Sequence, residues 1–353
     1  MNFLLLPISF LYHIVLNIRH KLFDWHILKS KQFEQPVICV GNLALGGTGK
    51  TPHIEYLIDL LAEQYRVCVV SRGYGRKTKG FQLASETCCA ETVGDEPLQY
   101  ATKYNDVLVA VDENRNEAIE LMNTMDRPPE LFLLDDAFQH RRTEAGLNIL
   151  LTDYNKLYSN DFLIPAGTLR DIRSAAQRAQ IVIVTKFPKT EAINETTVLE
   201  LRKQLKLNEK QKLFISHQEH EPLKPANQAA KNIDYDLDSN TNILCFSGIA
   251  NSKPLIEHLN KTFGEVKEIK FRDHHQYGDK DAQHILNAFE GMTQKEKIIV
   301  TTEKDYARII NSPYLCQFDS VPLFVAPISV SIHQEEEFNK EIFDYVRKNH
   351  HHS

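Results

Sequence analysis

Residues 43–57, LALGGTGKTPHIEYL, decide the fold, because this stretch reads as a phosphate-binding loop that opens a helix. Its Lys50 and Thr51 complete the P-loop pattern G-x-x-x-x-G-K-[ST], although Ala44 stands in place of the first glycine. An apolar run at residues 37–40 precedes it as a buried strand, and apolar residues at helical spacing follow it: Ile54, Leu57, Ile58 and Leu61. Strand, glycine-rich loop and helix in this order predict a nucleotide-binding loop.

Each part of the loop has a chemical role in such a site. Backbone N–H groups of the glycines can surround phosphate oxygens at the helix N-terminus, where the helix dipole also favours an anion. Lys50 would reach the β- and γ-phosphates, and the Thr51 hydroxyl would bind Mg²⁺. The expected nucleotide contacts are Gly46, Gly47, Thr48, Gly49, Lys50 and Thr51.

Length and composition predict a globular protein of about two domains. The chain has 353 residues, 42% hydrophobic and 25% charged, and a formal net charge of -6 gives no reason to expect nucleic acid as a partner. Its six cysteines are scattered and include no C-x-x-C pair, so a reducing cytosol is expected and a structural zinc site is not.

Continuous apolar runs alternate with helical patterns through the first two thirds of the chain, which is typical of parallel strands buried on both faces. A polar stretch at residues 220–242 reads as a hinge, and a second, smaller α/β pattern follows it. We therefore predict an α/β protein, with a P-loop NTPase-like parallel sheet domain and a smaller α/β domain. The predicted limits are an N-terminal helix at residues 1–28, a core domain at 29–225, a linker at 226–241 and the smaller domain at 242–348.

The most apolar stretch is FLLLPISFLYHIVLNI, residues 3–18, which is shorter than the about 20 residues of a spanning helix. Ser9, His13 and Asn17 recur every four residues and predict one polar stripe on an amphipathic helix. One interpretation places this helix in a membrane interface, with the basic residues Arg19, His20 and Lys21 near anionic head groups. The alternative is a helix packed on its own domain.

Two carboxylate pairs follow predicted elements of the core. Asp135 and Asp136 stand at the carboxyl end of the strand at 131–134, where one of them could hold Mg²⁺; they could also be a solvated helix cap. Asp95 and Glu96 follow a glycine in TVGDEPLQY, residues 92–100, where a carboxylate could accept a hydroxyl proton or begin a helix.

The smaller domain adds polar residues after two of its predicted strands. His274 and His275 follow one strand and could tune a carboxylate base, ligate a metal or lie on the surface. Lys304 and Asp305 follow another, where they could contact a nucleotide base or pair with each other.

Together these motifs resemble the tetraacyldisaccharide 4'-kinase family of lipid A biosynthesis. The matching segments keep the order of the family: GNLALGGTGKTP (41–52), SRGYGR (71–76), VGDEP (93–97), DDAFQH (135–140), LIPAGTLRD (163–171), DHHQY (273–277) and TEKD (302–305). The resemblance implies that Ala44 is natural to this loop, because the family carries its extra glycine at Gly46-Gly47. Ala137 and Asp171 depart from the family pattern, which often has Gly and Glu there.

The resemblance implies a kinase that uses ATP and Mg²⁺ to phosphorylate the 4'-hydroxyl of tetraacyldisaccharide 1-phosphate, at the cytoplasmic face of the inner membrane. It would be attached peripherally or monotopically through the N-terminal helix, with no protein partner implied. The implied catalytic residues are Asp95 as base, His274, Lys50 and Arg170. The implied metal ligands are Thr51, Asp135, Asp136 and Glu96, and further nucleotide contacts are Gln139, His140 and Arg115. Because Asp95 and His274 fall in different predicted domains, the site would require domain closure.

Two other classes of function use some of the same motifs. A nucleotide-hydrolysing switch, such as a GTPase or a metallochaperone ATPase, would need the P-loop and Asp135, but it gives no role to Asp95 or the N-terminal helix. A non-catalytic membrane-associated binding module predicts that Asp95→Asn leaves all activity unchanged.

Overall fold

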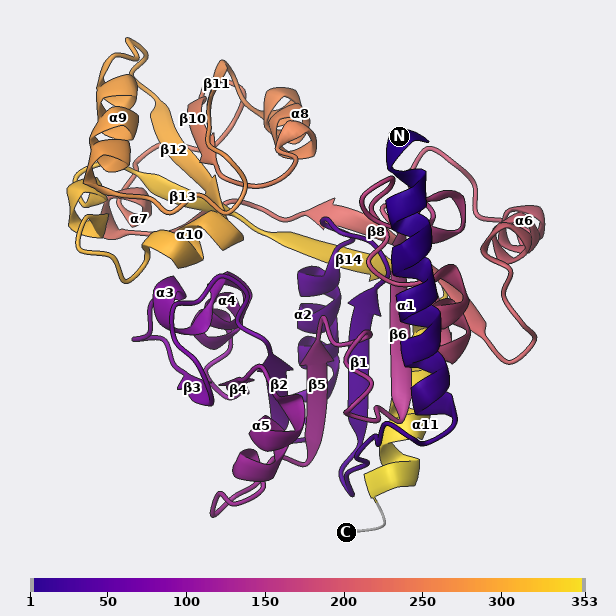
Figure 1. The fold of residues 1–353 in the computed structure, drawn as a ribbon. Helices are drawn as coiled ribbons and strands as arrows, with labels where there is room; N and C mark the ends of the chain where they lie inside the picture. The colour runs from indigo at the N-terminus through magenta and orange to yellow at the C-terminus, as the bar shows by residue number, and fades with distance from the viewer. Residues whose placement is uncertain (1–2, 351–353) are drawn as a thin grey trace.

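Two β-sheets organise the chain, which is seen in a computed structural model that describes residues 3–350. The larger sheet, with its helices, forms a core domain, and the smaller sheet forms a second domain that stands above one end of it (Figure 1). The P-loop NTPase-like core and the smaller α/β domain predicted from the sequence are therefore both present.

The larger sheet is mainly parallel, with β1 at its centre. Within residues 3–350 its nine strands are, in spatial order, β14 (Ile328–Ile332), β8 (Lys212–His220), β7 (Ile181–Thr185), β6 (Leu147–Asp153), β1 (Val37–Asn42), β5 (Leu131–Asp135), β2 (Val67–Ser71), β4 (Leu108–Val111) and β3 (Gln82–Ala84). Strands β1, β2, β5 and β7 are buried along their whole length, which explains their uninterrupted apolar sequences. Their parallel order brings the ends of β1 and β5, which precede the P-loop and Asp136, to the same edge.

Helices cover both faces of this sheet. One face is covered by α2 (Lys50–Leu61), α4 (Asp95–Lys103) and α11 (Glu335–His350). The other carries α1 (Leu6–Asp24), α5 (Arg115–Met122) and α6 (Glu195–Leu205). Short helical segments complete the domain: η1 (Phe3–Leu5), α3 (Ala90–Val93), η2 (Tyr158–Asn160) and η3 (Arg173–Arg178).

The smaller sheet repeats this plan with fewer elements. In the described part of the chain its strands are, in spatial order, β11 (Val266–Lys270), β10 (Asn242–Ser247), β12 (Lys297–Thr302), β13 (Leu323–Ala326) and β9 (Lys224–Pro225). Its helices are α7 (Gln228–Lys231), α8 (Lys253–Thr262), α9 (Asp279–Glu290), α10 (Glu303–Ile309) and η4 (Leu315–Phe318). Leu255 and Leu259 of α8 pack on one face of the sheet, and Ile285 and Phe289 of α9 pack on the other.

Two strands of the larger sheet, β8 and β14, carry the chain to the smaller domain and back (Figure 1). They pair antiparallel, with Ile328 opposite His220 and Ile332 opposite Ser216. The smaller domain is therefore inserted between β8 and β14.

Two segments do not follow the domain limits that the sequence predicted. Residues 328–348 were assigned to the smaller domain, but β14 pairs in the larger sheet and α11 buries Phe338 and Ile342 in the core beneath it. Residues 226–241 were assigned to a linker, but Ala230 of α7 is buried against the smaller sheet. Polar composition suggested a hinge there, whereas the crossings lie at the ends of β8 and β14.

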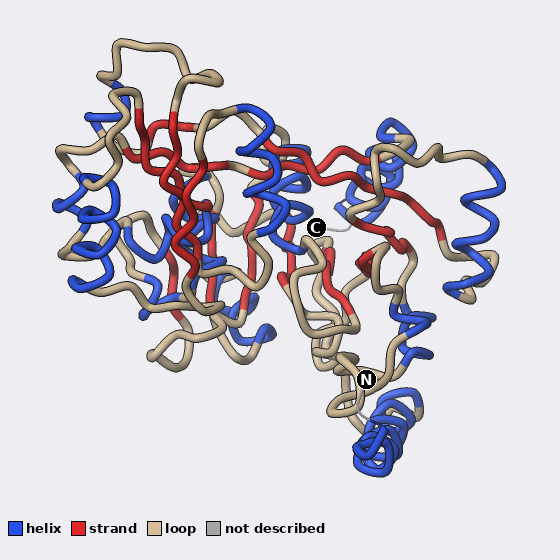
Figure 2. The backbone as a smooth tube through the Cα atoms, turned by 90° about the horizontal axis from the view of Figure 1, so that it is seen from above, coloured by secondary structure: helices blue, strands red, loops and turns tan. Residues whose placement is uncertain are grey.

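The N-terminal helix α1 lies at the periphery of the molecule, where Figure 2 shows it almost end-on. Its predicted polar stripe does not face water or head groups as a whole, because Ser9 is buried against the core; His20, predicted to lie near head groups, is buried there too. Arg19 also turns to the protein and donates to the carbonyl of Gln139 at 2.9 Å. Residues 1 and 2 of the predicted segment lie outside the described residues.

The opposite face of α1 exposes a set of large apolar side chains: Ile8, Phe10, Leu11, Ile14, Val15 and Ile18. The predicted amphipathic arrangement is therefore not confirmed, because Ser9, Arg19 and His20 contact the protein while the large apolar side chains are exposed. None of the helices in residues 3–350 combines the length and apolar composition that crossing a bilayer requires.

Candidate active site

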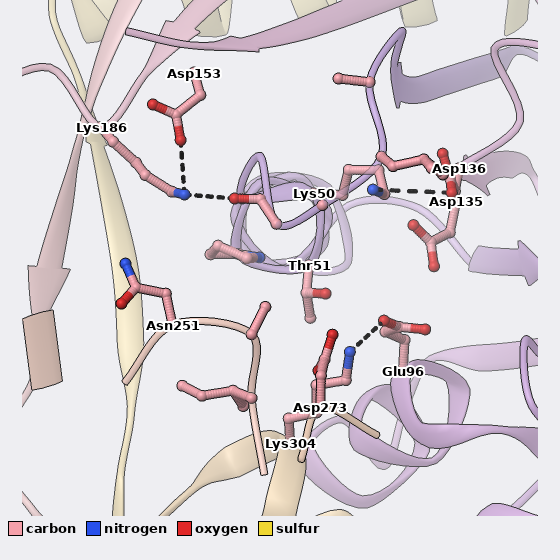
Figure 3. A pocket seen from close by; sticks show the side chains of 18 of the residues that line it. Lys50, Thr51, Glu96, Asp135, Asp136, Asp153, Lys186, Asn251, Asp273 and Lys304 are labelled. Atoms are coloured by element: carbon pink, nitrogen blue, oxygen red, sulfur yellow. Dashed lines mark hydrogen bonds and ion pairs between the residues drawn. The ribbon is translucent and has the colours of Figure 1, made fainter. Parts of the chain in front are cut away.

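A cleft of about 1790 Å³ opens between the two domains at the carboxyl edge of the larger sheet. Lys50, Thr51 and Asp135 line it from the core, and Asn251, His274 and Lys304 line it from the smaller domain. In Figure 3 the N-terminus of α2 points into this space, with Asp135 and Asp136 on one side and Lys186 on the other. Most of the residues predicted from the sequence therefore meet in one place.

The P-loop backbone has the conformation that its glycines allow. Gly46 and Gly49 have φ angles of +112° and +85°, in the left-handed region where a side chain would be strained. The hydroxyl of Thr48 accepts a hydrogen bond from Asn42 Nδ2 at 2.8 Å, and its carbonyl accepts one from the Thr185 hydroxyl at 2.9 Å. These contacts fix the loop between the ends of β1 and β7 before any phosphate binds.

Two further side chains hold the loop, and sequence reasoning missed both. Lys186 donates to the carbonyl of Gly47 and pairs with Asp153 at 2.8 Å (Figure 3). Burial lowers the pKa of His53 to about 4, so its ring is neutral near pH 7. Its Nδ1 then donates to the Gly49 carbonyl at 2.7 Å, and its Nε2 accepts from the Ser216 hydroxyl at 3.0 Å. The position of Lys186 directly after a predicted strand was the available signal.

Asp135 and Asp136 lie side by side, but their surroundings shift the two pKa values in opposite directions. Asp135 ends β5, and burial together with the charges of Glu96 and Asp136 raises its pKa to about 7. In the described part of the chain it makes no ion pair, and the Ser71 hydroxyl donates to its Oδ2 at 3.4 Å. Its carboxylate is therefore available to a cation from outside the chain.

Asp136 has both of its oxygens occupied by the protein. Arg170 donates to Oδ2 at 2.8 Å and also to Oδ1, and Lys50 Nζ lies 3.8 Å from Oδ2. Burial alone would raise its pKa, but Lys50 and Arg170 outweigh burial and the pKa is lowered. Asp136 therefore positions the two cations of the P-loop region.

Several predicted nucleotide contacts surround this pair. Gln139 donates from Nε2 to the Asn42 carbonyl at 2.7 Å, which fixes it beside the P-loop. Arg115 Nε, Arg170 Nε and His140 Nε2 are buried and make no hydrogen bond within residues 3–350. Unpaired buried donors on two arginines are uncommon in folded proteins, and anionic oxygens of a ligand would satisfy them.

Asp171 is placed differently from its neighbours. It is fully buried, pairs with His20 Nε2 at 2.6 Å and accepts the backbone N–H of Ile172 at 2.8 Å. It therefore fastens α1 to the core, and its short side chain reaches the helix.

Asp95 and His274 meet across the cleft between the domains. Asp95 is the first residue of α4, after Gly94 with a φ of +95°, and its Oδ2 lies 3.1 Å from His274 Nδ1. His274 itself has a φ of +55° and its ring contacts Tyr74, with the centroids 5.4 Å apart. His275 points elsewhere, because its Nε2 lies 3.0 Å from Asp281 Oδ2 and its ring stacks on Phe271. The contacts therefore distinguish His274, which lies beside Asp95, from His275, a choice that the sequence left open.

Two cations of α10 also reach α4, and neither was assigned there from the sequence. Arg308 donates to Asp95, and Lys304 Nζ lies 3.0 Å from Glu96 Oε1 (Figure 3). Burial raises the pKa of Asp95, but hydrogen bonds from His274 and Arg308 outweigh burial, and the pKa is lowered overall. Asp95 is therefore an ionised carboxylate at neutral pH.

The arrangement joins a loop suited to polyphosphate, an ionised carboxylate paired with histidine, and a buried carboxylate without a cation. Such groups suit phosphoryl transfer, in which a polyphosphate must be held and a hydroxyl proton needs an acceptor.

Comparison with known proteins gives a consistent result. A sequence model described as Tetraacyldisaccharide-1-P 4'-kinase matches residues 1–347. A Tetraacyldisaccharide 4'-kinase of Bacteroides thetaiotaomicron is 43% identical over 356 residues, covering 98% of this chain and 93% of the relative. The corresponding protein of Flavobacterium johnsoniae is 43% identical over 347 residues, covering 98% and 97%.

A solved structure has the same fold. The crystal structure of LpxK from Aquifex aeolicus in complex with ATP superposes with a TM-score of 0.75 at 30% identity, covering 97% of this chain and 98% of that chain. With the motifs in order, the cleft assembled and the whole length matched, the chain belongs to the tetraacyldisaccharide-1-P 4'-kinase family.

Proposed function

We propose that this protein transfers the γ-phosphoryl group of ATP to the 4'-hydroxyl of tetraacyldisaccharide 1-phosphate, giving the 1,4'-bisphosphorylated lipid. The observation that carries the proposal is the Asp95–His274 pair, which joins an ionised carboxylate to a histidine that lines the same cleft as the P-loop. Membership of the kinase family supports the same reaction.

The P-loop is the proposed site of the ATP phosphates. The N-terminus of α2, the Lys50 ammonium and the backbone of residues 46–49 offer positive charge and N–H donors to them. Arg115 and Arg170 line the same cleft, and each has a buried Nε–H without a partner in residues 3–350; both guanidinium groups suit phosphate oxygens. The ATP in the related crystal structure agrees with this proposal.

Mg²⁺ is the metal that such a site would take, and the residues fit it. Mg²⁺ commonly uses one or two carboxylates with waters and phosphate oxygens, so a closed cage of protein ligands is not needed. Asp135 is a buried carboxylate without a cationic partner in residues 3–350, and Thr51 lines the same cleft. We assign Asp135 and Thr51 to the metal, since Asp136 already binds Lys50 and Arg170 and Glu96 pairs with Lys304. When bound, Mg²⁺ neutralises charge on the phosphates.

The chain's own residues would then act on the acceptor. Asp95 accepts the 4'-hydroxyl proton as the new oxygen–phosphorus bond forms and the bond between the γ-phosphorus and the bridging oxygen breaks, releasing ADP. His274 holds Oδ2 of Asp95, and Lys50 and Arg170 stabilise negative charge on the phosphoryl group. Because Asp95 and His274 come from different domains, the site is complete only while the cleft is closed.

We also propose that the protein works at the cytoplasmic face of the inner membrane, attached peripherally through α1. An acceptor with four acyl chains must be taken from a lipid surface, and the exposed apolar side chains of α1 suit such a surface. Neither a nucleic-acid nor a protein partner is part of the proposal.

The deciding test is transfer of γ-labelled phosphate from Mg-ATP, with and without tetraacyldisaccharide 1-phosphate in detergent micelles. We expect label in the lipid, and we expect Asp95→Asn to abolish most of it. Label found only in free phosphate, at the same rate without lipid, would instead support a nucleotide-hydrolysing switch. Full activity of Asp95→Asn would remove the base assignment.

A further inference from the structure

Arg308 of α10 connects the smaller domain to the candidate base of the core domain. Its Nε and Nη2 donate to Oδ2 of Asp95 at 2.9 and 2.8 Å, and the side chain is 4% exposed. Two N–H groups of one planar guanidinium converge on a single carboxylate oxygen, so this contact fixes direction as well as charge.

The smaller domain holds the same guanidinium from behind. Nη1 of Arg308 donates to Oδ1 of Asp305 at 2.7 Å and to the Gly248 carbonyl at 2.8 Å. Asp305 is fully buried, and its carboxylate accepts further hydrogen bonds from Tyr277, Thr302 and the Gly248 N–H. The arginine is therefore held in one orientation by its own domain, independently of Asp95.

The two oxygens of Asp95 are used unequally. Within residues 3–350, the hydrogen bonds from Arg308 and His274 all end at Oδ2, and none reaches Oδ1. A carboxylate held by one oxygen keeps the lone pairs of the other for a new donor. The acceptor hydroxyl is the donor that the proposed reaction brings.

We propose that Arg308 is a positioning residue for the reaction, which holds Asp95 by Oδ2 and leaves Oδ1 for the hydroxyl of the sugar. This inference rests on the proposed kinase function and adds a residue to it. Arg308 acts through Asp95, and it reaches that residue from the other domain.

Another ion pair at the same interface provides a matched control. Lys103 of α4 binds Glu303 of α10 at 2.9 Å and Glu55 at 2.8 Å, without touching Asp95. Lys103→Gln removes this contact between the domains together with the pair to Glu55, but it leaves Asp95 untouched, whereas Arg308→Gln weakens domain contact and releases the base. A purely structural role for Arg308 would make the two variants behave alike.

The experiment is a double-mutant cycle, read as lipid phosphorylation with kcat and the KM for ATP measured separately. We expect Arg308→Gln to lower kcat about tenfold or more while the KM for ATP changes less than about twofold. In the Asp95→Asn background the same change should alter the residual rate less than about twofold, because the group it positions is gone. Lys103→Gln should have the same effect in both backgrounds.

Arg308→Lys keeps a positive charge at this position, so it tests the inference without removing the ion pair from the interface. We expect its kcat to lie between those of wild type and Arg308→Gln, because one ammonium cannot donate to Asp95, Asp305 and Gly248 in the same geometry. Thermal melting of each variant reports whether the fold is retained.

Three results would overturn the inference. Arg308→Gln could keep the wild-type kcat, or it could lower the rate by the same factor in the Asp95→Asn background as in the wild type. In the third, Arg308→Gln would raise the KM for ATP as much as it lowers kcat. Failure of the proposed function looks different, because the wild type itself would then leave the lipid unlabelled. Label in the wild type that Asp95→Asn removes upholds the function, whatever Arg308→Gln does.

Discussion

His274 Nδ1 lies 3.1 Å from Oδ2 of Asp95, although the two residues are 179 positions apart in the chain and belong to different domains. In the reaction we propose, this contact makes closure of the domains part of the chemistry. A variant that alters either residue should therefore lower turnover more than it weakens the binding of ATP, whose phosphates we assign to the P-loop of the core domain.

The first prediction compares the base with the P-loop lysine. Asp95→Asn should lower kcat about 100-fold or more, since an amide cannot take the hydroxyl proton, and leave the Kd for ATP within about twofold. Lys50→Ala should weaken both, because it removes charge from the phosphate site. Equilibrium nucleotide binding and steady-state rates are the measurements, and equal losses of ATP affinity would contradict the assignment.

The second prediction concerns the adjacent histidines. His274→Ala should lower kcat about tenfold, because Oδ2 of Asp95 loses one of its donors. His275→Ala should leave kcat within about twofold, since His275 contacts Asp281 and Phe271 away from the base. The opposite ranking of the two rates would reverse the choice between them.

The third prediction separates the two carboxylates after β5. Asp135→Asn should raise the Mg²⁺ concentration for half-maximal rate about tenfold or more, because it removes a proposed metal ligand. Asp136→Asn should lower kcat at every Mg²⁺ concentration, because it frees Lys50 and Arg170 from their partner. Rates measured across a Mg²⁺ titration decide this, and a matching Mg²⁺ shift in both variants would argue against the division of roles.

The fourth prediction concerns the exposed face of α1. Phe10 and Leu11 are 63% and 64% exposed, so changing each to Ser should leave the melting temperature unchanged. Binding to vesicles of anionic phospholipid should fall about tenfold per substitution, as apolar surface is lost from the interface.

Ser9 on the buried face is the control for that experiment. Its hydroxyl donates to the Leu163 carbonyl at 2.9 Å and accepts the Ala166 N–H at 3.0 Å. Ser9→Ala should therefore lower the melting temperature and spare vesicle binding. Unchanged cosedimentation of the Phe10 and Leu11 variants would refute attachment through this face.

The fifth prediction is a loss of stability in acid that arises where β8 meets the smaller domain. The rings of His220 and His258 stack with centroids 4.4 Å apart. Burial lowers the pKa of both, with the charge of His258 adding to the effect on His220 and that of Lys261 to the effect on His258. The unfolded chain then binds protons more readily, so stability is present above the ordinary pKa of 6.5 and is lost as pH falls through the folded values.

The charge of Glu219 raises the pKa of His220 and the charge of Lys189 lowers it, and the pKa of His220 is lowered overall. His258→Gln should flatten the fall in unfolding free energy between about pH 7.5 and about pH 5.5. His284→Gln changes an exposed histidine of α9 and should leave the fall as in wild type. Identical slopes for all three proteins would show that the stack does not contribute.

Sequence patterns predicted the core strands well because their environments are uniform. Strands buried on both faces, such as β1 and β7, carry uninterrupted apolar residues, and no other arrangement suits that pattern as well. β8 was not recognised, because its second half, from His217 to His220, is polar where it leaves the core towards the smaller domain. β14 joins the larger sheet by pairing with β8, and no local sequence pattern reveals a pairing between strands so far apart in the chain.

The candidate site was predictable in part for a similar reason. Motifs located Asp95, His274 and the P-loop, because each lies in a short segment with its own residue pattern; His274 and the P-loop line the cleft, and Asp95 contacts His274. Arg308 was missed because its role depends on the docking of α10 against α4, a contact between segments distant in sequence. The buried faces of Ser9 and His20 were missed because periodicity shows which residues share a side of a helix, not whether water or a protein carboxylate lies opposite.

The insertion of the smaller domain between β8 and β14 also sets an order of assembly during synthesis. The ribosome delivers the central strand β1 early, but the hydroxyl of Tyr345 in α11 completes two hydrogen bonds to Val37 across 308 positions. Until residues 328–350 emerge, β8 is an unpaired edge, and the apolar face that Phe338 and Ile342 cover stays exposed. The nascent core must therefore wait for the inserted domain to be made, which gives chaperones a defined surface to protect during that interval.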